Sequence, residues 1–439
     1  MDQFFMHKIF LLWLTCVFLT CCKPENEGEL YQKIWVGTIN APGQSISLNF
    51  GFDKSFFGTI ECKISIPQQQ VFELQASECR IIGDSLYLKF SDKMLANYKA
   101  KLVSGHISGK WTQGNYSFPL TLQNSGRTLF QLYTENALNI AKENALNARE
   151  VDWITLRKTA LAMTEKSTDQ LIAALQLILR NLKDKHGFIL FNNKSINYET
   201  DNFENISPAL SQAAHGNDKD IVSVLLSDSI AYLRIPKSPD FQSNTDETYN
   251  QQIQKHVCNL ITKNASNWII DLRLNYGGNM FAMLAGLNKL LGDGKVGAFV
   301  NEDGKESGTW IMKGGNFYNQ QEQKTSSGTR CATRIKPGKI AILTGPITAS
   351  SGEAVAIALR SLDDSQIFGE PSKGSTTALS GFNIGKDLTF FISTGYYSDG
   401  KGHIYKNGVP PDVLIKNGDN FDEIQQDEKV KAAVQWIQN

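Results

Sequence analysis

The chain has 439 residues, enough for two or three domains, and its 41% hydrophobic and 20% charged residues are typical of a globular protein. Lysine plus arginine equals aspartate plus glutamate at 44 each, without a polybasic run, so no nucleic-acid partner is expected. The sequence has no phosphate-binding glycine loop, no metal-ligand cluster and no GxSxG turn, which argues against an NTPase, a metallopeptidase and an α/β-hydrolase esterase; no cofactor is expected.

Residues 1–22 have the pattern of a lipoprotein signal peptide. A lysine precedes an apolar run at 9–20, which is too short to span a bilayer but fits a signal peptide. The run ends Leu-Thr-Cys-Cys and resembles a bacterial lipoprotein box, with Cys22 the better lipidation candidate and Cys21 the alternative. Polar residues 23–30 would form a tether. The sequence predicts a bacterial cell-envelope protein, lipid-anchored to the membrane and facing the periplasm or the outside, with an ordinary cleaved signal as the alternative.

Residues 31–123 predict a small all-β module, because short segments of alternating apolar residues recur between glycine and asparagine turns. Its last part, 104–123, resembles the lipocalin-like modules found beside exported hydrolases, which implies a spacer or docking domain. Export also allows disulfides, and the four cysteines beyond the signal could pair as Cys62 with Cys79 and Cys258 with Cys331. The sequence establishes neither bond.

Residues 127–192 predict a helical segment. Apolar residues at helical spacing continue from 129 to about 182, with a break near 147–152, and a glycine ends the last helix. His186 therefore lies at a helix-to-strand junction. The polar interval 193–220 predicts a loop.

Residues 221–439 predict an α/β domain, because strands and helices alternate as in a mostly parallel sheet. Strands are expected at 229–235, 268–272, 308–312, 340–343, 366–369 and 388–397, and helices at 247–263, 280–291 and 423–438. The glycine pair Gly277-Gly278 follows the second strand, where glycines let backbone amides approach a ligand.

Residues 339–362 read as a buried strand, a tight turn and a helix that begins near Ser351. Ser350 thus precedes a helix N-terminus, where unpaired amides can stabilise an oxyanion, so it is a candidate nucleophile. Serine is also a favoured N-cap, and Ser350 could simply cap the helix.

Four motifs occur in order: IIDLRLNYGG at 269–278, TASSGE at 348–353, GEPSKG at 369–374 and NGVPPD at 407–412. Together they resemble the tail-specific or C-terminal processing serine peptidases, which have a ClpP/crotonase-like fold. VDW at 151–153 and DKHGF at 184–188 resemble the tricorn-core and nisin-resistance branch, in which histidine is the base. The resemblance covers roughly 152–412 and implies hydrolysis of peptide or protein substrates through a covalent acyl-enzyme.

Carried over residue by residue, the resemblance implies Ser350 as the nucleophile and His186 as the base. It implies oxyanion donors at the amides of Gly277 or Gly278 and of Ser351. These positions agree with the glycine turn and the serine turn read from the residues themselves.

The sequence departs from the family pattern in two places. Ser375 stands where the main branch has its lysine base, with Lys373 two positions earlier as an alternative base. Tyr405 stands where tricorn-like members have a glutamate that supports the histidine, and a tyrosine cannot stabilise an imidazolium as a carboxylate does.

The stretch between His186 and Ile230 is too short for the PDZ domain that many members carry, so substrate choice would rest with the cleft, the helical segment or the β-module. A non-catalytic ligand- or peptide-binding lipoprotein on the same fold is the alternative function. The oligomeric state is open.

Overall fold

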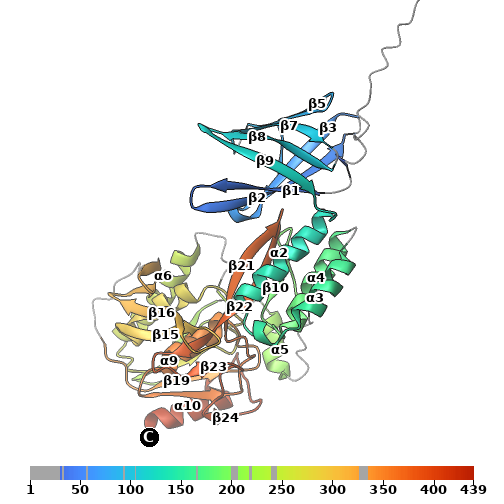
Figure 1. Ribbon diagram of the computed structural model, residues 1–439. Coiled ribbons are helices and arrows are strands. Elements are labelled where there is room, and N and C mark those ends of the chain that lie inside the picture. The colour runs from blue at the N-terminus through green and yellow to red at the C-terminus, as the bar shows by residue number, and fades with distance from the viewer. Residues whose placement is uncertain are drawn as a thin grey trace, which may run out of the picture. The chain divides into compact units, whose positions relative to one another are not determined.

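The computed structural model describes residues 30–31, 34–55, 58–91, 94–103, 105–164, 167–198, 206–216, 220–238, 245–325 and 335–439. The expected signal peptide with Cys21 and Cys22 lies outside these residues, as does Cys331. The chain divides into two compact units, 1–129 and 130–439, and each is described by itself (Figure 1). No helix in the described ranges is long and apolar enough to cross a membrane.

The first unit is built on one nine-stranded antiparallel sheet, in the order β4-β3-β2-β1-β9-β8-β7-β6-β5. Its strands form because alternate side chains are apolar, and in β7 the buried and exposed residues alternate over six positions. The strands are β1 (Ile34–Ala41), β2 (Gln44–Lys54), β3 (Ile60–Ile66), β4 (Val71–Gln75), β5 (Glu78–Ile82), β6 (Ser85–Phe90), β7 (Ala96–Val103), β8 (His106–Gln113) and β9 (Tyr116–Asn124).

The sheet curls around one core, since β3 and β5 contact each other although they lie near opposite ends of the strand order. Phe50, Tyr98 and Trp111 pack together in this core. Cys62 and Cys79 are free thiols, so the pairing that the sequence allowed is not formed. Burial raises the pKa of Cys62, and it raises the pKa of Cys79 to about 12, which disfavours the thiolates that disulfide exchange requires.

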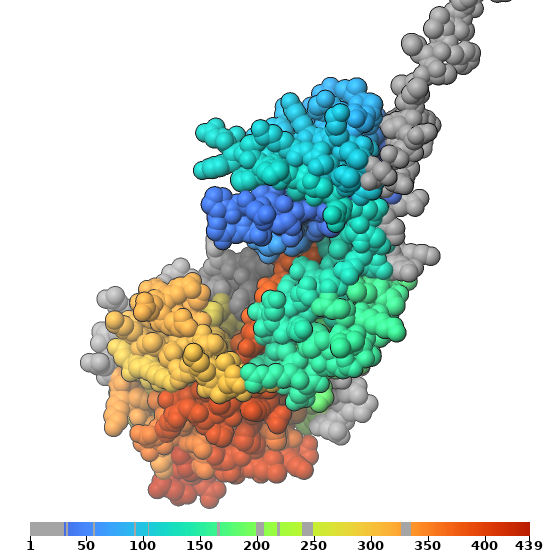
Figure 2. All heavy atoms as spheres, viewed as in Figure 1, coloured from blue at the N-terminus to red at the C-terminus, as the bar shows by residue number. Residues whose placement is uncertain are grey.

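The second unit begins with three helices, α2 (Leu129–Asn144), α3 (Trp153–Met163) and α4 (Thr168–Asn181). The boundary between the units falls after Leu129, the first residue of α2. These helices lie within residues 127–192, where the sequence predicts a helical segment, and Asn147, at the predicted break, has a positive φ of 61°. Side-chain caps begin two of them: Asp152 accepts from the α3 amides, and Ser167 accepts from Gln170 N at 3.3 Å. In Figure 2 this green segment lies against the yellow-to-red remainder of the unit.

A six-stranded sheet in the order β12-β13-β14-β19-β20-β24 forms the centre of the second unit. It is parallel except for β12, which confirms the predicted mostly parallel sheet. The strands are β12 (Val222–Leu225), β13 (Ile230–Arg234), β14 (Asn267–Asp271), β19 (Ile340–Thr344), β20 (Ser365–Gly369) and β24 (Val413–Leu414).

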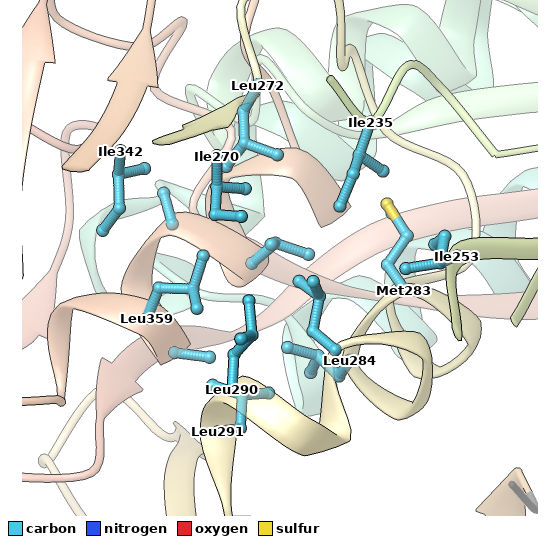
Figure 3. Close-up of a cluster of buried hydrophobic side chains, with 14 of the residues drawn as sticks. Ile235, Ile253, Ile270, Leu272, Met283, Leu284, Leu290, Leu291, Ile342 and Leu359 are labelled. Atoms are coloured by element: carbon cyan, nitrogen blue, oxygen red, sulfur yellow. The ribbon is translucent and has the colours of Figure 1, made fainter. Parts of the chain in front are cut away.

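Helices cover both faces of this sheet, which explains the uninterrupted apolar strands. One face packs on α6 (Thr245–Thr262), α7 (Met280–Gly286), α8 (Asn288–Leu291) and α9 (Ser351–Arg360), and the other on α10 (Glu428–Gln438). Figure 3 shows side chains of β14, β19 and α9 meeting those of α7 and α8 in the first of these cores.

A second sheet brings the helical segment to the α/β part, because β10 from that segment pairs with β22 from the C-terminal part. Its order is β11-β10-β22-β15-β16-β17-β18, and β21 and β23 also pair with β22. The strands are β10 (Phe188–Phe191), β11 (Lys194–Ile196), β15 (Gly294–Val300), β16 (Glu306–Lys313), β17 (Asn316–Asn319), β18 (Glu322–Thr325), β21 (Thr377–Gly385), β22 (Leu388–Asp399) and β23 (Ile404–Tyr405).

Two expectations about this part of the chain were wrong, and one strand was not predicted at all. The interval 193–220, expected as a loop, contains β11 and the helix α5 (Pro208–His215), whose buried Leu210 packs against apolar residues distant in sequence. Residues 292–325 contain four strands, whereas one was expected there, at 308–312, because these strands pair within the second sheet despite their polar composition. Strand β21 was not predicted, and its burial does not alternate.

Candidate active site

Ser350 lies in a tight turn between β19 and α9 and has an unusual backbone conformation, with φ 54° and ψ −119°. Such a conformation is rare for a residue with a side chain and occurs mainly where surrounding contacts hold it. Here the Ser350 amide donates to the Glu353 carboxylate at 2.6 Å, and the preceding Ala349 amide donates to the Asn275 carbonyl at 3.0 Å. These two hydrogen bonds hold Ser350 between α9 and the glycine pair.

Glu353 organises the loops around Ser350, the candidate nucleophile. Its fully buried carboxylate accepts from Ser350 N, from Ser372 Oγ at 2.5 Å and from Gly374 N at 2.8 Å. Burial raises the pKa of Glu353 to about 7, although these hydrogen bonds act to lower it. The sequence analysis missed this residue; its position three after a serine before a helix is a signal that could have found it.

His186 contacts the candidate nucleophile, although the two residues are 164 positions apart: its Nε2 lies 3.1 Å from Ser350 Oγ. Its Nδ1 lies 2.8 Å from Thr377 Oγ1. Burial lowers the pKa of His186 to about 4; the charge of Asp184 raises it and that of Lys373 lowers it further. The imidazole is therefore neutral at pH 7 and can accept a proton.

The turn after β14, which contains Gly277 and Gly278, lies next to Ser350. A Cβ on Gly277, whose φ is +123°, would lie 3.3 Å from the Ser350 Cβ. The Gly277 amide donates to Asn275 Oδ1 at 3.1 Å, whereas those of Gly278 and Ser351 donate to no other described residue. Ser351 Oγ donates to the Gly278 carbonyl at 2.6 Å, which holds these two residues together. Of the glycine pair, Gly278 thus offers the available amide.

Tyr397, on β22, is a further residue at the site that the sequence analysis did not identify. Its side chain is buried, which raises the pKa of its hydroxyl, and the side chain of Ser350 acts to lower that pKa. A neutral phenol can donate to an oxygen that gains negative charge. No local pattern distinguishes it from an ordinary strand aromatic.

Lys373 and Tyr405 belong to the two segments in which the sequence departs from the family pattern. Their contacts differ from the contact that His186 makes with Ser350. The Tyr405 hydroxyl donates to Asp399 Oδ2 at 3.2 Å, in a contact separate from the imidazole. The Lys373 side chain is exposed and acts on His186 through its charge, and it is His186 that bonds to Ser350 Oγ.

A cavity of about 390 Å³ opens beside His186. Its walls come from the helical segment, the loop after β20, and β22, and they carry charges of both signs. The lining residues are Leu146, Asn147, Glu150, Lys183, Asp184, Lys185, His186, Gly374, Thr377, Ser393, Tyr396, Lys406 and Asn407. Within the described ranges, no group of three or more His, Cys, Asp or Glu side chains could hold a metal ion. The neutral imidazole of His186 contacts the Ser350 hydroxyl, and the backbone amides of Gly278 and Ser351 lie beside it without another acceptor among the described residues. This arrangement is suited to acyl transfer.

Comparisons with known proteins show similarity to peptidases. Residues 229–415 match peptidase family S41. The chain is 23% identical over 313 residues to the nisin-resistance protein of Lactococcus lactis subsp. lactis, covering 70% of this chain and 87% of that protein. The solved structure of a lipoprotein from Streptococcus agalactiae is similar in fold, with 20% identity, a TM-score of 0.53, and coverage of 70% of this chain and 96% of that one. The matched residues include the glycine pair and the serine turn, so this part of the chain is similar to peptidase family S41, as its resemblance to the C-terminal processing serine peptidases predicts.

Proposed function

We propose that this protein is a serine endopeptidase that hydrolyses peptide bonds of protein or peptide substrates. The observation that carries the proposal is the 3.1 Å contact between His186 Nε2 and Ser350 Oγ. A histidine within hydrogen-bond reach of a serine is the geometry that general-base activation requires. The match of residues 229–415 to a peptidase family supports a peptide bond as the target.

In the proposed mechanism, His186 Nε2 takes the proton of the Ser350 hydroxyl as Oγ attacks the peptide carbonyl. The amides of Gly278 and Ser351 then donate to the oxyanion of the tetrahedral intermediate. His186 returns the proton to the leaving amine, and a water molecule hydrolyses the acyl-enzyme by the same route in reverse. The low pKa of His186, about 4, keeps the imidazole in the proton-accepting form at neutral pH.

We also propose the finer assignments that follow from the family resemblance. Residues 221–439 would form a ClpP/crotonase-like peptidase domain, residues 127–192 a helical segment that supplies the base, and residues 31–123 a lipocalin-like spacer or docking module. Residues 1–22 would direct export and leave a lipid anchor on Cys22 or Cys21, followed by the tether at 23–30. The protein would then act at the bacterial cell envelope.

Labelling with a fluorophosphonate probe tests the proposal. The mature protein should gain the mass of one phosphonyl group, since fluoride leaves as the Ser350 Oγ–P bond forms, and peptide mapping should locate that group at Ser350. His186→Ala should slow labelling by about 10²- to 10⁴-fold, which is the usual contribution of a general base. A folded wild-type protein that takes up no probe would contradict the proposal.

A non-catalytic peptide- or ligand-binding protein on the same fold is the second candidate. The observation that favours it is that His186 Nδ1 bonds to the Thr377 hydroxyl, where a carboxylate would stabilise the imidazolium better. Binding of peptides without labelling at Ser350 would support this candidate.

A further inference from the structure

The imidazole nitrogen that faces away from Ser350 connects to a carboxylate through two hydroxyl groups. His186 Nδ1 lies 2.8 Å from Thr377 Oγ1, which lies 2.8 Å from Ser393 Oγ. Ser393 Oγ donates to Asp184 Oδ1 at 2.7 Å. We propose that Asp184 is the acid partner of His186 and acts through a relay formed by Thr377 and Ser393. The inference rests on the proposed roles of His186 and Ser350.

The carboxylate sets the direction of every hydrogen bond in the relay. An ionised carboxylate only accepts, so the single hydroxyl proton of Ser393 must point to Asp184. Ser393 Oγ must then accept from Thr377, whose own proton is thereby used. Thr377 Oγ1 can only accept from His186, which requires the proton of the neutral imidazole to be on Nδ1. The lone pair of Nε2 is then directed at Ser350 Oγ, as a general base requires.

Asp184 is held in place firmly enough for this task. It is 7% exposed, and its Oδ2 accepts from Ser393 N at 2.7 Å while its Oδ1 accepts from Gly187 N at 2.9 Å. A Cβ on Gly187 would lie 2.8 Å from Asp184 Oδ2, so the chain can approach the carboxylate closely only with glycine there. The charge of Asp184 also acts on the imidazole directly and raises the pKa of His186.

The relay explains how the site can do without the family glutamate that Tyr405 replaces. The supporting acid comes from the segment that carries the histidine, two residues earlier in the chain. The two hydroxyls come from β21 and β22, which pair with each other. Thr377, Ser393 and Asp184 are therefore positioning residues, since they act on the reaction through His186.

Variants that interrupt the relay without removing His186 test the inference in the full mature protein. Thr377→Val removes the hydroxyl but keeps the shape of the side chain, and Thr377→Ser keeps the hydroxyl. Ser380→Ala is the matched control, because Ser380 Oγ and Thr394 Oγ1 form a similar hydroxyl pair between the same two strands at 2.9 Å. The readouts are the second-order rate of fluorophosphonate labelling and the ¹⁵N chemical shifts of the His186 ring, which report the tautomer.

Thr377→Val should slow labelling on the order of 10²-fold, as expected when a reacting group loses its orientation, and should shift the ring away from the Nδ1–H tautomer. Thr377→Ser should restore both, and Ser380→Ala should change neither. Asp184→Asn should lower the pKa of His186, because it removes the charge that raises it.

Wild-type labelling rate and tautomer in Thr377→Val, together with the expected slow labelling of His186→Ala, would overturn the relay and leave the proposed function intact. No labelling of the wild-type protein would instead count against the proposed function itself.

Discussion

At the scale of single residues, the candidate site depends on keeping an imidazole uncharged beside lysines. The pKa of His186 is lowered to about 4 by burial and by the charge of Lys373, against the opposing charge of Asp184. A histidine with an ordinary pKa near 6.5 would be partly protonated at neutral pH, and a protonated imidazole cannot accept the serine proton. The fall of the labelling rate at acidic pH therefore reports the pKa of His186.

Lys373→Ala should raise the pKa of His186, because it removes a positive charge that disfavours the imidazolium. The acid limb of the labelling rate against pH, near pH 4 in the wild type, should move to higher pH, while the rate at pH 8 stays within the same order of magnitude. Lys386→Ala, which removes an exposed charge at the β21–β22 turn, is the control and should leave the profile unchanged. Loss of labelling at all pH values in Lys373→Ala would show that the lysine, not His186, is the base.

At the scale of secondary-structure elements, the site is assembled from three chain turns. β14 ends at Asp271 and leads to the glycine pair, β19 leads into the serine turn, and α4 ends before the DKHGF segment. Parallel β14 and β19 are neighbours, so their carboxyl ends bring the glycine pair and Ser350 together. His186 joins them because β10, which follows it, pairs with β22.

Gly278→Ala should damage the oxyanion site. Gly278 has φ +108°, and a Cβ there would lie 2.4 Å from Ser238 Oγ and 2.7 Å from the Ser238 carbonyl oxygen, so the turn must shift. Loss of one oxyanion donor typically costs about 10²- to 10³-fold, and the turnover of a peptide substrate should fall by a similar factor.

Gly402→Ala is the matched control for this variant, since Gly402 also has a positive φ, +92°, but has open space around its Cβ position. Its turnover should match the wild type. Equal losses in the two variants would mean that backbone strain, not the oxyanion site, accounts for the effect.

At the scale of the whole molecule, a buried ion network fastens the C-terminal part of the second unit to its central sheet. Arg273, at the end of β14, contacts Asp271 at 2.6 Å, Asp419 at 2.8 Å and Asp427 at 2.6 Å, and all four side chains are at most 1% exposed. Asp427 also caps α10 by accepting from its first amides. The network lies just before the glycine pair in sequence, so it stabilises the strand that presents that turn.

Asp427→Ala should lower the free energy of unfolding of the second unit by about 3–5 kcal/mol, because it leaves Arg273 buried with one partner fewer. Chemical denaturation measures the loss. Glu428→Gln, which removes an exposed ion pair with Lys431 in the same helix, should cost less than about 1 kcal/mol. Similar small losses in both variants would show that the network contributes little.

The same network gives stability a pH dependence with a definite sign. Burial alone would raise the pKa of Asp271, but the charge and hydrogen bonds of Arg273 outweigh it and hold the pKa below its ordinary value of 3.8. A lowered carboxyl pKa stabilises the folded state above the ordinary value, and that contribution is lost as the pH falls below 3.8. Unfolding of the second unit should therefore become easier in this acidic range.

The amino-acid sequence by itself was enough to predict the resemblance to a peptidase family, the alternation of strands and helices, and Ser350 and His186 as the candidate pair. These follow from local patterns: apolar periodicity sets the elements, and ordered short motifs mark the turns where glycine, serine and histidine are needed. Polar segments such as 292–325 gave no such pattern, because their strands form by pairing with β22 and with one another.

Only the tertiary structure decided what surrounds the two candidate catalytic residues. It placed Thr377 on the imidazole, connected Ser393 to Asp184 across 209 positions, and showed which glycine amide is available. Threonine and serine are common, and nothing near them in sequence signals a partner so far along the chain. A hydrogen bond between distant segments depends on which strands pair and in which register, and that is a property of the folded chain.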